Sequence, residues 1–141
     1  MKTVLETRSI QKYFYSPLKF QVLDDINIKI KQGEFVSISG KSGCGKSTLL
    51  YVLSTMDRDY EGELFIDGAS MKTKTEKQLA IVRNEKIGFV FQFHYLLNEF
   101  TVLKNVMLPA LKLGKFTKKE IEHRAYEKLK ALGIEDQAQD V

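Results

Sequence analysis

The sequence contains no tryptophan, a single cysteine, only two prolines and no long hydrophobic run. One cysteine excludes an internal disulfide and agrees with a reducing compartment. No stretch approaches the roughly 18 uninterrupted apolar residues of a membrane-spanning helix. Residues 1–8 also lack the apolar segment of a signal peptide. We therefore expect a soluble, cytosolic protein.

The sequence also has no large excess of charge of one sign. It contains 22 Lys and Arg residues and 18 Asp and Glu residues, for a net charge of +4. This balance is compatible with an anionic ligand or an anionic membrane surface. No dense basic run with interleaved aromatic residues appears, so we expect no nucleic-acid binding. The 141 residues are 43% hydrophobic and free of low-complexity tracts, which indicates one folded domain with a core.

Residues 40–47 read Gly-Lys-Ser-Gly-Cys-Gly-Lys-Ser, which matches the phosphate-binding loop G-x-x-x-x-G-K-[ST]. At average residue usage, its fixed positions coincide by chance in well under roughly 1% of chains this long. The required context is a strand before the loop and a helix after it. Residues 35–38 suit a buried strand and residues 47–53 suit an apolar helix. The alternative is a glycine-rich turn that binds nothing.

Each residue type in this loop has a physical role toward a nucleotide. Glycines let the backbone take positive φ and bring its N–H groups close to an anion at the start of a helix. Lys46 supplies a positive charge for the β- and γ-phosphates, Ser47 a hydroxyl ligand for Mg²⁺, and Thr48 a donor for the α-phosphate side. The predicted ATP-binding set is Gly40, Ser42, Gly43, Cys44, Gly45, Lys46, Ser47 and Thr48.

The rest of the chain predicts an α/β fold with an antiparallel layer. Residues 3–10, 20–23, 26–30 and 63–66 read as strands, and residues 87–91 as a strand buried on both faces. Capping boxes at Thr75 and Thr117 open helices that we expect to end near Glu85 and at Gly133. A helix from Thr101 should be kinked or shortened by Pro109.

At this point the sequence resembles the ATP-binding domain of ABC transporters, over nearly the whole chain. The resemblance rests on residues 23–35, the loop at 43–50, the strand and turn at 61–68, the Q-loop segment at 87–97, and residues 101–109. It implies a P-loop NTPase core at 35–56 and 86–92, an antiparallel β layer at 1–34 and 61–68, a Q-loop region at 93–100, and the start of a helical subdomain at 101–141. The last two segments look most like the lipoprotein-release and macrolide-export branch.

The resemblance implies further roles for named residues. Gln92 would complete the Mg²⁺ and water shell and report γ-phosphate occupancy. An aromatic side chain near the first strands would stack on adenine; Tyr13 is our choice, with Phe14 and Tyr15 as rivals. A membrane permease subunit would contact the surface between Phe93 and Asn105 and hold the protein at the inner face of the cell membrane. A second ATP-binding domain would pair with it head to tail.

The family's signature loop, Walker B aspartate, catalytic glutamate, D-loop and switch histidine would all lie beyond Val141. The fold is therefore expected to be incomplete, with weak or absent ATP binding and no appreciable hydrolysis. In this family the Walker B strand lies beside the loop-bearing strand, so Phe35, Val36 and Ile38 should be exposed. The resemblance favours export as the direction of transport, and it is also the basis for expecting an incomplete domain.

Two other functions remain open. The chain could be a non-enzymatic remnant that binds nucleotide, or nothing, and acts only by association; a coding sequence that continues in frame past Val141 to Leu-Ser-Gly-Gly-Gln would indicate truncation instead. A small P-loop kinase would need an acceptor site and an arginine-rich lid. The four arginines Arg8, Arg58, Arg83 and Arg124 do not cluster in sequence.

Overall fold

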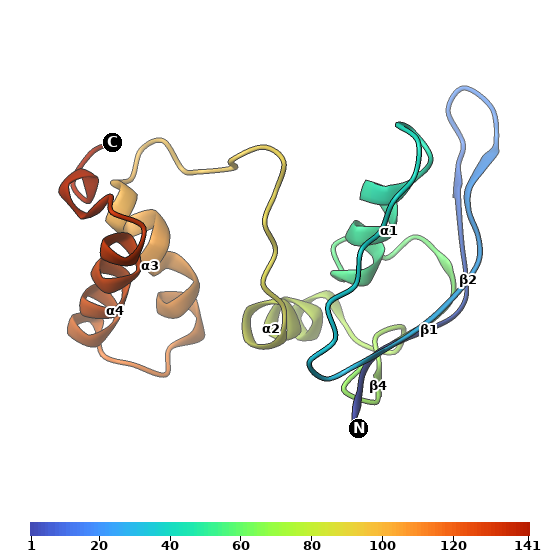
Figure 1. Ribbon diagram of the computed structural model, residues 1–141, viewed down its shortest axis with the longest axis horizontal. Helices are drawn as coiled ribbons and strands as arrows, with labels where there is room; N and C mark the ends of the chain where they lie inside the picture. Colours follow the sequence, from blue (N-terminus) through green and yellow to red (C-terminus); the bar gives the residue numbers. More distant parts are fainter. The chain divides into compact units, whose positions relative to one another are not determined.

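The computed structural model describes residues 1–141 as two compact units, Met1–Arg83 and Asn84–Val141. We call them the N-terminal and C-terminal units and describe each by itself. Figure 1 follows the chain from the strands and the first helix to the helices at its end. No helix has the length and apolar character needed to span a bilayer.

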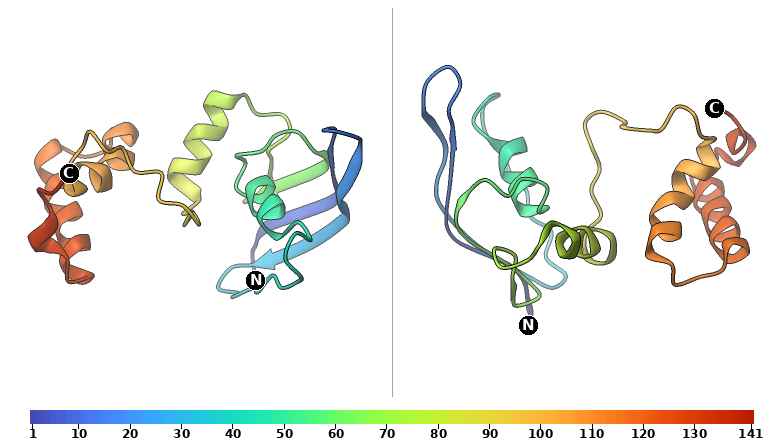
Figure 2. Two further views of the ribbon diagram at one scale, coloured as in Figure 1. Left: turned by 90° about the horizontal axis from the view of Figure 1, so that it is seen from above. Right: turned by 180° about the vertical axis from the view of Figure 1, so that it is seen from behind.

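The N-terminal unit is built on a four-stranded antiparallel sheet. Its strands are β1 (Thr3–Phe14), β2 (Phe20–Lys31), β3 (Glu61–Ile66) and β4 (Ala69–Ser70), in the order β2-β1-β3-β4. β1 lies between β2 and β3, and Leu5 is opposite Ile30 on one side and Ile66 on the other. The view from above in Figure 2 shows these strands side by side. The expected antiparallel layer is confirmed.

β2 is one strand where the sequence predicted two, and an irregularity in pairing explains the difference. The register of β1 and β2 shifts between Thr7 and Ile10. Ser9 and Asp25 take positive φ there, at 49° and 46°. The side chain of Asn27 holds both, because its Oδ1 accepts from Ser9 N at 2.8 Å and its Nδ2 donates to the Asp25 carbonyl at 2.9 Å. A bulge interrupts the apolar alternation without ending the strand.

Gly62 in β3 faces the same irregular stretch of β1. Its φ is 92°, and a Cβ at this position would lie 2.3 Å from the carbonyl oxygen of Ser9. Only glycine satisfies both conditions, since a side chain would be strained by the backbone angle and blocked by the neighbouring strand. Gly62 therefore permits the close approach of β3 to β1.

The helix α1 (Lys46–Leu53) covers one face of the sheet (Figure 1). Its Leu49, Val52 and Leu53 are buried, as are Ile10 and Leu64 of the strands. Burial of side chains of this size stabilises a fold by about 1.5–3 kcal/mol each, so the buried residues of α1 and of the strands contribute substantially to the stability of this unit. The core thus lies directly behind the segment that leads into α1.

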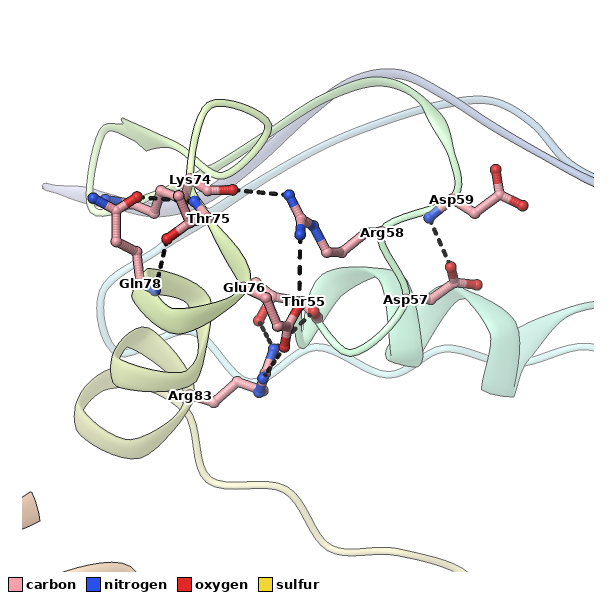
Figure 3. A network of polar contacts seen from close by, with 9 residues as sticks. All are labelled: Thr55, Asp57, Arg58, Asp59, Lys74, Thr75, Glu76, Gln78 and Arg83. Carbon is pink, nitrogen blue, oxygen red and sulfur yellow. Dashed lines mark hydrogen bonds and ion pairs between the residues drawn. The ribbon is translucent and has the colours of Figure 1, made fainter. Parts of the chain in front are cut away.

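The helix α2 (Glu76–Lys86) begins at the predicted capping box: Thr75 N donates to Gln78 Oε1 at 2.9 Å, and Gln78 N donates to Thr75 Oγ1 at 3.3 Å. Arg83, about two turns along the helix from Glu76, pairs with Glu76 at 2.5 Å and donates to the carbonyl of Thr55 just after α1 at 3.1 Å. Figure 3 shows these polar contacts together. They fasten α2 to the end of α1.

The C-terminal unit consists of α3 (Val102–Leu113), α4 (Lys118–Ala131) and the short 3-10 helix η1 (Glu135–Gln137). Thr101 caps α3 and Gly114 ends it with a φ of 71°. The predicted capping box at Thr117 is present in full. Pro109 was expected to kink or shorten α3; the helix continues through it to Leu113, so Pro109 does not shorten it. The core is formed by Leu103, Met107, Ile121, Ala125, Leu129 and Ala138.

Residues 35–38 and 87–91 form no strand, which corrects two predictions. Strands of a central parallel sheet need hydrogen-bonding neighbours, and the sheet of this chain holds only β1 to β4. Val90 is accordingly 96% exposed, whereas a strand buried on both faces was expected. The expected exposure of the other segment is confirmed, with Phe35 97% exposed and Val36 and Ile38 also on the surface.

Candidate functional site

The loop at residues 40–45 turns into α1 through two glycines with left-handed backbone. Gly43 has a φ of 78°, and Gly45, the residue before the helix, has a φ of 99°. The carbonyl of Gly45 accepts the first helical hydrogen bond, from Leu49 N at 2.9 Å. Residues with a Cβ rarely take these angles, so the glycine spacing of the sequence is what allows this loop.

Two glycines also allow close packing around the loop. A Cβ at Gly45 would lie 2.8 Å from Cγ1 of Val22 in β2, and one at Gly40 would lie 2.6 Å from Sγ of Cys44. Both distances are shorter than an ordinary van der Waals contact. Gly45 therefore seats the start of α1 against β2, and Gly40 leaves room for the turn that follows it.

The ammonium group of Lys46 lies over this loop. Its Nζ donates to the carbonyl of Gly40 at 2.8 Å and to that of Lys41 at 2.7 Å, with Sγ of Cys44 at 3.6 Å. These contacts hold the flexible side chain at the concave side of the loop. A positive charge is thus placed at the N-terminal end of α1, where the helix dipole also favours an anion.

A hollow of about 400 Å³ opens in front of the loop. This volume is within the range of small-ligand sites. One side of the hollow is polar, from the loop and the first residues of α1, and the other is apolar, from β1 and β2. No acidic residue lines it. The lining residues are Phe14, Phe20, Val22, Ser42, Gly43, Gly45, Lys46, Ser47 and Thr48.

Most of the sequence-predicted nucleotide-binding residues meet at this hollow. Six of the eight loop residues line it, while Gly40 and Cys44 contact Lys46 instead. The glycine turns, the ammonium group of Lys46 and the three hydroxyl groups of Ser42, Ser47 and Thr48 form a donor set that fits a phosphate chain. The Ser47 hydroxyl is also an oxygen ligand that fits Mg²⁺.

The aromatic side of the hollow differs from our first choice. Phe14 and Phe20 line it, with ring centroids 5.7 Å apart and planes tilted by 31°. Tyr13 does not; its hydroxyl donates to Gln11 Oε1 at 2.9 Å, and Lys19 Nζ lies 4.5 Å from its ring centroid. Of the three aromatic candidates, Phe14 is therefore the one beside the loop.

Sequence reasoning missed Phe20 and Val22. Alternation along β2 places these two residues on one face of the strand, and that face is the one the loop approaches. The alternation along β2 indicated that Phe20 and Val22 share a face of the strand. The sequence did not indicate which face of β2 the loop would meet.

Gln92 belongs to the C-terminal unit, where it is exposed and follows the irregular segment 87–91. The aromatic rings around it pack on one another: Phe91 lies 4.7 Å from Phe89 and 4.9 Å from Tyr95, measured between centroids. The role of Gln92 at a metal ion therefore stays a prediction.

The predicted partner surface also lies in the C-terminal unit. Phe93, Tyr95, Leu96 and Leu97 all expose large hydrophobic side chains. Asn105 of α3 holds the end of this segment through hydrogen bonds of its side chain to the backbone of Leu97, Phe100 and Thr101. The expected contact of this segment with a membrane permease stays a prediction.

Comparison with known proteins gives the same family from sequence and from structure. Residues 23–141 match the profile of the family described as "ABC transporter". The chain is 46% identical over 136 residues to the lipoprotein-releasing system ATP-binding protein LolD of Aquifex aeolicus, and 47% identical over 135 residues to LolD of Porphyromonas gingivalis. Each match covers 96% of this chain and 59% or 60% of the relative.

Among solved structures, the ATP-binding cassette MJ0796 in a dimeric post-hydrolysis state bound to ADP and Pi is similar, with a TM-score of 0.88 and 36% identity. The match covers 96% of this chain and 60% of that one. The chain thus spans about 60% of the length of the relatives it matches. Because the family profile matches residues 23–141, and the LolD and MJ0796 proteins resemble almost the whole of this sequence, the chain belongs to the ABC transporter family.

Proposed function

We propose that this chain is the nucleotide-binding part of an ABC transporter ATP-binding subunit, and that it binds ATP with Mg²⁺ in the hollow between the 40–47 loop and β1–β2. The observation that carries the proposal is the placement of Lys46, Ser47 and Thr48 on one side of this hollow and of Phe14 and Phe20 on the other. A nucleotide has the same two halves, an anionic chain and a flat apolar base.

The chain's own groups would act on the phosphates by charge and position. Backbone N–H groups of the glycine turns and the start of α1 would donate to phosphate oxygens, and Lys46, already held by two carbonyls, would neutralise charge on the β- and γ-phosphates. The Ser47 hydroxyl would hold Mg²⁺, which when bound offsets charge on the same oxygens. On the base side, Phe14 would stack on the adenine ring.

For the complete family domain we propose ATP hydrolysis that drives a membrane partner. Residues 1–141 supply the phosphate-binding half, because no carboxylate lines the hollow to hold the metal or activate water. We accordingly propose weak nucleotide binding and no appreciable turnover for this chain by itself. The comparison with cassettes that bind ADP and Pi supports the ligand class.

We propose two partners. A membrane permease subunit would bind the exposed apolar segment between Phe93 and Asn105, and so hold the protein at the inner face of the cell membrane. A second ATP-binding domain would pair head to tail with the complete domain, as the dimeric MJ0796 structures suggest. The names of the LolD relatives favour lipoprotein release as the process that is driven.

Nucleotide titration of the 141-residue chain tests the proposal. We expect weak but saturable ATP–Mg²⁺ binding by NMR or calorimetry, lost in Lys46→Ala and retained in Lys41→Ala. The second variant is a matched control, since Lys41 is a neighbouring lysine of the same loop whose backbone carbonyl, not its side chain, contacts Lys46. Equal binding by Lys46→Ala and the wild type would contradict the proposed site. Turnover that Lys46→Ala abolishes would contradict the proposed inactivity.

A further inference from the structure

Lys12, two residues before Phe14 on β1, is a charged side chain in the interior of the N-terminal unit. It is only 4% exposed. A buried ammonium group destabilises a fold unless it is paired and hydrogen-bonded. Lys12 lies outside the 40–47 loop and is not apolar, so neither phosphate binding nor core packing explains its burial. Nothing in the residues next to Lys12 indicates its burial.

Three oxygen atoms from the segment after α1 satisfy this ammonium group. Lys12 Nζ donates to Oδ2 of Asp57 at 3.0 Å, to the carbonyl of Asp59 at 2.6 Å and to Oδ2 of Asp59 at 3.2 Å. An ammonium group has three donors, so all of them are used. Burial alone would lower the pKa of Lys12, but the hydrogen bonds to Asp57 and Asp59 outweigh it and raise that pKa overall. Lys12 is therefore charged when folded.

The position of Asp57 is itself fixed. Its Oδ1 accepts from Asp59 N at 2.9 Å, a contact drawn in Figure 3, while its Oδ2 accepts from Lys12. Only 26% of this side chain is exposed, whereas 83% of the Asp59 side chain is. Asp57 is thus the better shielded of the two partners, and it ties the end of β1 to the segment that follows α1.

The same ammonium group faces the ring of Phe14, with Nζ 5.1 Å from the ring centroid. This distance is within cation–π range. Phe14 is 39% exposed, and its ring also lies 5.7 Å from that of Phe20, measured between centroids. It also lines a second hollow of about 230 Å³, which shares Thr48 with the nucleotide hollow and includes Asp57. The charged cluster therefore adjoins the base side of the site.

We propose that Lys12 is a positioning residue for nucleotide binding: clamped by Asp57 and Asp59, it holds the Phe14 ring at the edge of the hollow for stacking on the base. This role rests on the proposed function. It adds to that function a residue that positions the aromatic side of the hollow, where the base would bind. Lys12 acts through Phe14 and has no part in holding the phosphates.

The test compares ATP with inorganic tripolyphosphate, each with Mg²⁺, because tripolyphosphate has no base to stack. Stacking is worth about 0.5–1.5 kcal/mol, so Phe14→Ala and Lys12→Met should each lower ATP affinity about two- to tenfold. Both should leave tripolyphosphate affinity unchanged. The double variant should lose no more ATP affinity than Phe14→Ala alone, because the two residues act through one contact.

Two further variants make the comparison specific. Lys72→Met is a matched control: Lys72 Nζ lies 4.3 Å from the Tyr60 ring centroid and donates to the Tyr60 carbonyl, but neither residue lines the nucleotide hollow. It should leave ATP affinity unchanged. Asp57→Asn keeps an oxygen for Asp59 N but weakens the ion pair, and it should reproduce the Lys12→Met pattern even where Lys12→Met itself fails to fold.

The results distinguish failure of the positioning role from failure of the proposed function. Equal losses of ATP and tripolyphosphate affinity in Lys12→Met and Asp57→Asn would show a merely structural role and overturn the positioning role alone. An ATP affinity that falls in Phe14→Ala but not in Lys12→Met, or losses that add up in the double variant, would do the same. A wild-type chain that binds neither ligand would overturn the proposed function, and the positioning role with it.

Discussion

The side-chain amide of Asn105 brackets the backbone of Leu97. Its Oδ1 accepts from Leu97 N at 2.9 Å, and its Nδ2 donates to the Leu97 carbonyl at 3.0 Å. The same Nδ2 also contacts the carbonyls of Phe100 and Thr101, at 3.3 and 3.1 Å. One side chain in the first turn of α3 therefore fixes the turn before the helix, and with it the end of the exposed apolar segment.

Replacing Asn105 by alanine should destabilise the C-terminal unit by about 1–3 kcal/mol, because backbone groups of residues 97–101 lose their partner. Urea unfolding with hydrogen exchange at residues 97–101 measures this effect. Lys112→Ala, on the exposed side of the same helix, is the control and should change little. Unaltered exchange at Leu97 in Asn105→Ala would contradict the role of this amide. In a complete transporter, the variant should weaken coupling to the permease while nucleotide binding is retained.

Gly62→Ala should destabilise the N-terminal unit by about 3 kcal/mol, the sum of a strained backbone angle and a close approach to Ser9. Gly68→Ala is its matched control. Gly68 has a similar φ of 79°, but a Cβ there would meet nothing within 4 Å, so only about 1–2 kcal/mol should be lost. Denaturant unfolding of both variants separates clash from strain. Equal losses would mean that β3 can move away from β1 without cost.

The capping box of α4 should make the C-terminal unit sensitive to acid. The hydrogen bond from Thr117 N, at 2.9 Å, holds the pKa of Glu120 below its usual value, with the Thr117 side chain and Arg124 acting in the same direction. Because the folded pKa is depressed, this contribution is complete above the unfolded pKa and is lost as pH falls through the folded value. The protection factor of the Thr117 amide, which is its exchange relative to an unstructured peptide at the same pH, should be constant near pH 7 and fall below about pH 4.3.

Glu120→Gln is the control for this pH dependence, since glutamine can accept the same hydrogen bond but does not titrate. In this variant, the protection factor of the Thr117 amide should not show the acid-dependent fall seen with glutamate. A fall of the same size in both proteins would assign the acid sensitivity to another group.

Exposure of Phe35 and its neighbours should cause self-association at high protein concentration, because a solvent-exposed apolar segment is a ready contact for a second copy. Sedimentation velocity over a range of concentrations should show association that Phe35→Ser reduces. Leu132→Ser removes an exposed side chain at the end of α4 and should leave association unchanged. A monomeric wild-type chain at all concentrations would contradict the expectation.

Local signals in the sequence were reliable wherever one short segment decides the structure. The capping boxes at Thr75 and Thr117, the glycine end of α3 and the loop at residues 40–47 all depend on contacts within a few residues, and all are present. The strands at 35–38 and 87–91 were predicted from composition alone. Strand formation needs partners elsewhere in the chain, and without them the same apolar residues lie on the surface.

In the candidate site, the residues of the polar side could be predicted from the sequence and those of the aromatic side could not. The polar side comes from one continuous motif, so its residues could be named from the sequence. The aromatic side depends on which residues of β1 and β2 face the loop, and the irregular pairing near Lys12 and Tyr13 shifts that register. Phe14 lines the hollow and Tyr13 does not, because successive residues of a strand point to opposite faces of the sheet. The burial of Lys12 depends on Asp57 and Asp59, more than forty residues away in the chain.

The separate core of the C-terminal unit has an evolutionary consequence. Leu103, Met107, Ile121 and their neighbours pack among themselves, and none of them belongs to the core behind the phosphate-binding loop. Substitutions can therefore accumulate among these helices without disturbing the packing of the residues behind the 40–47 loop, so the two units are free to diverge at different rates.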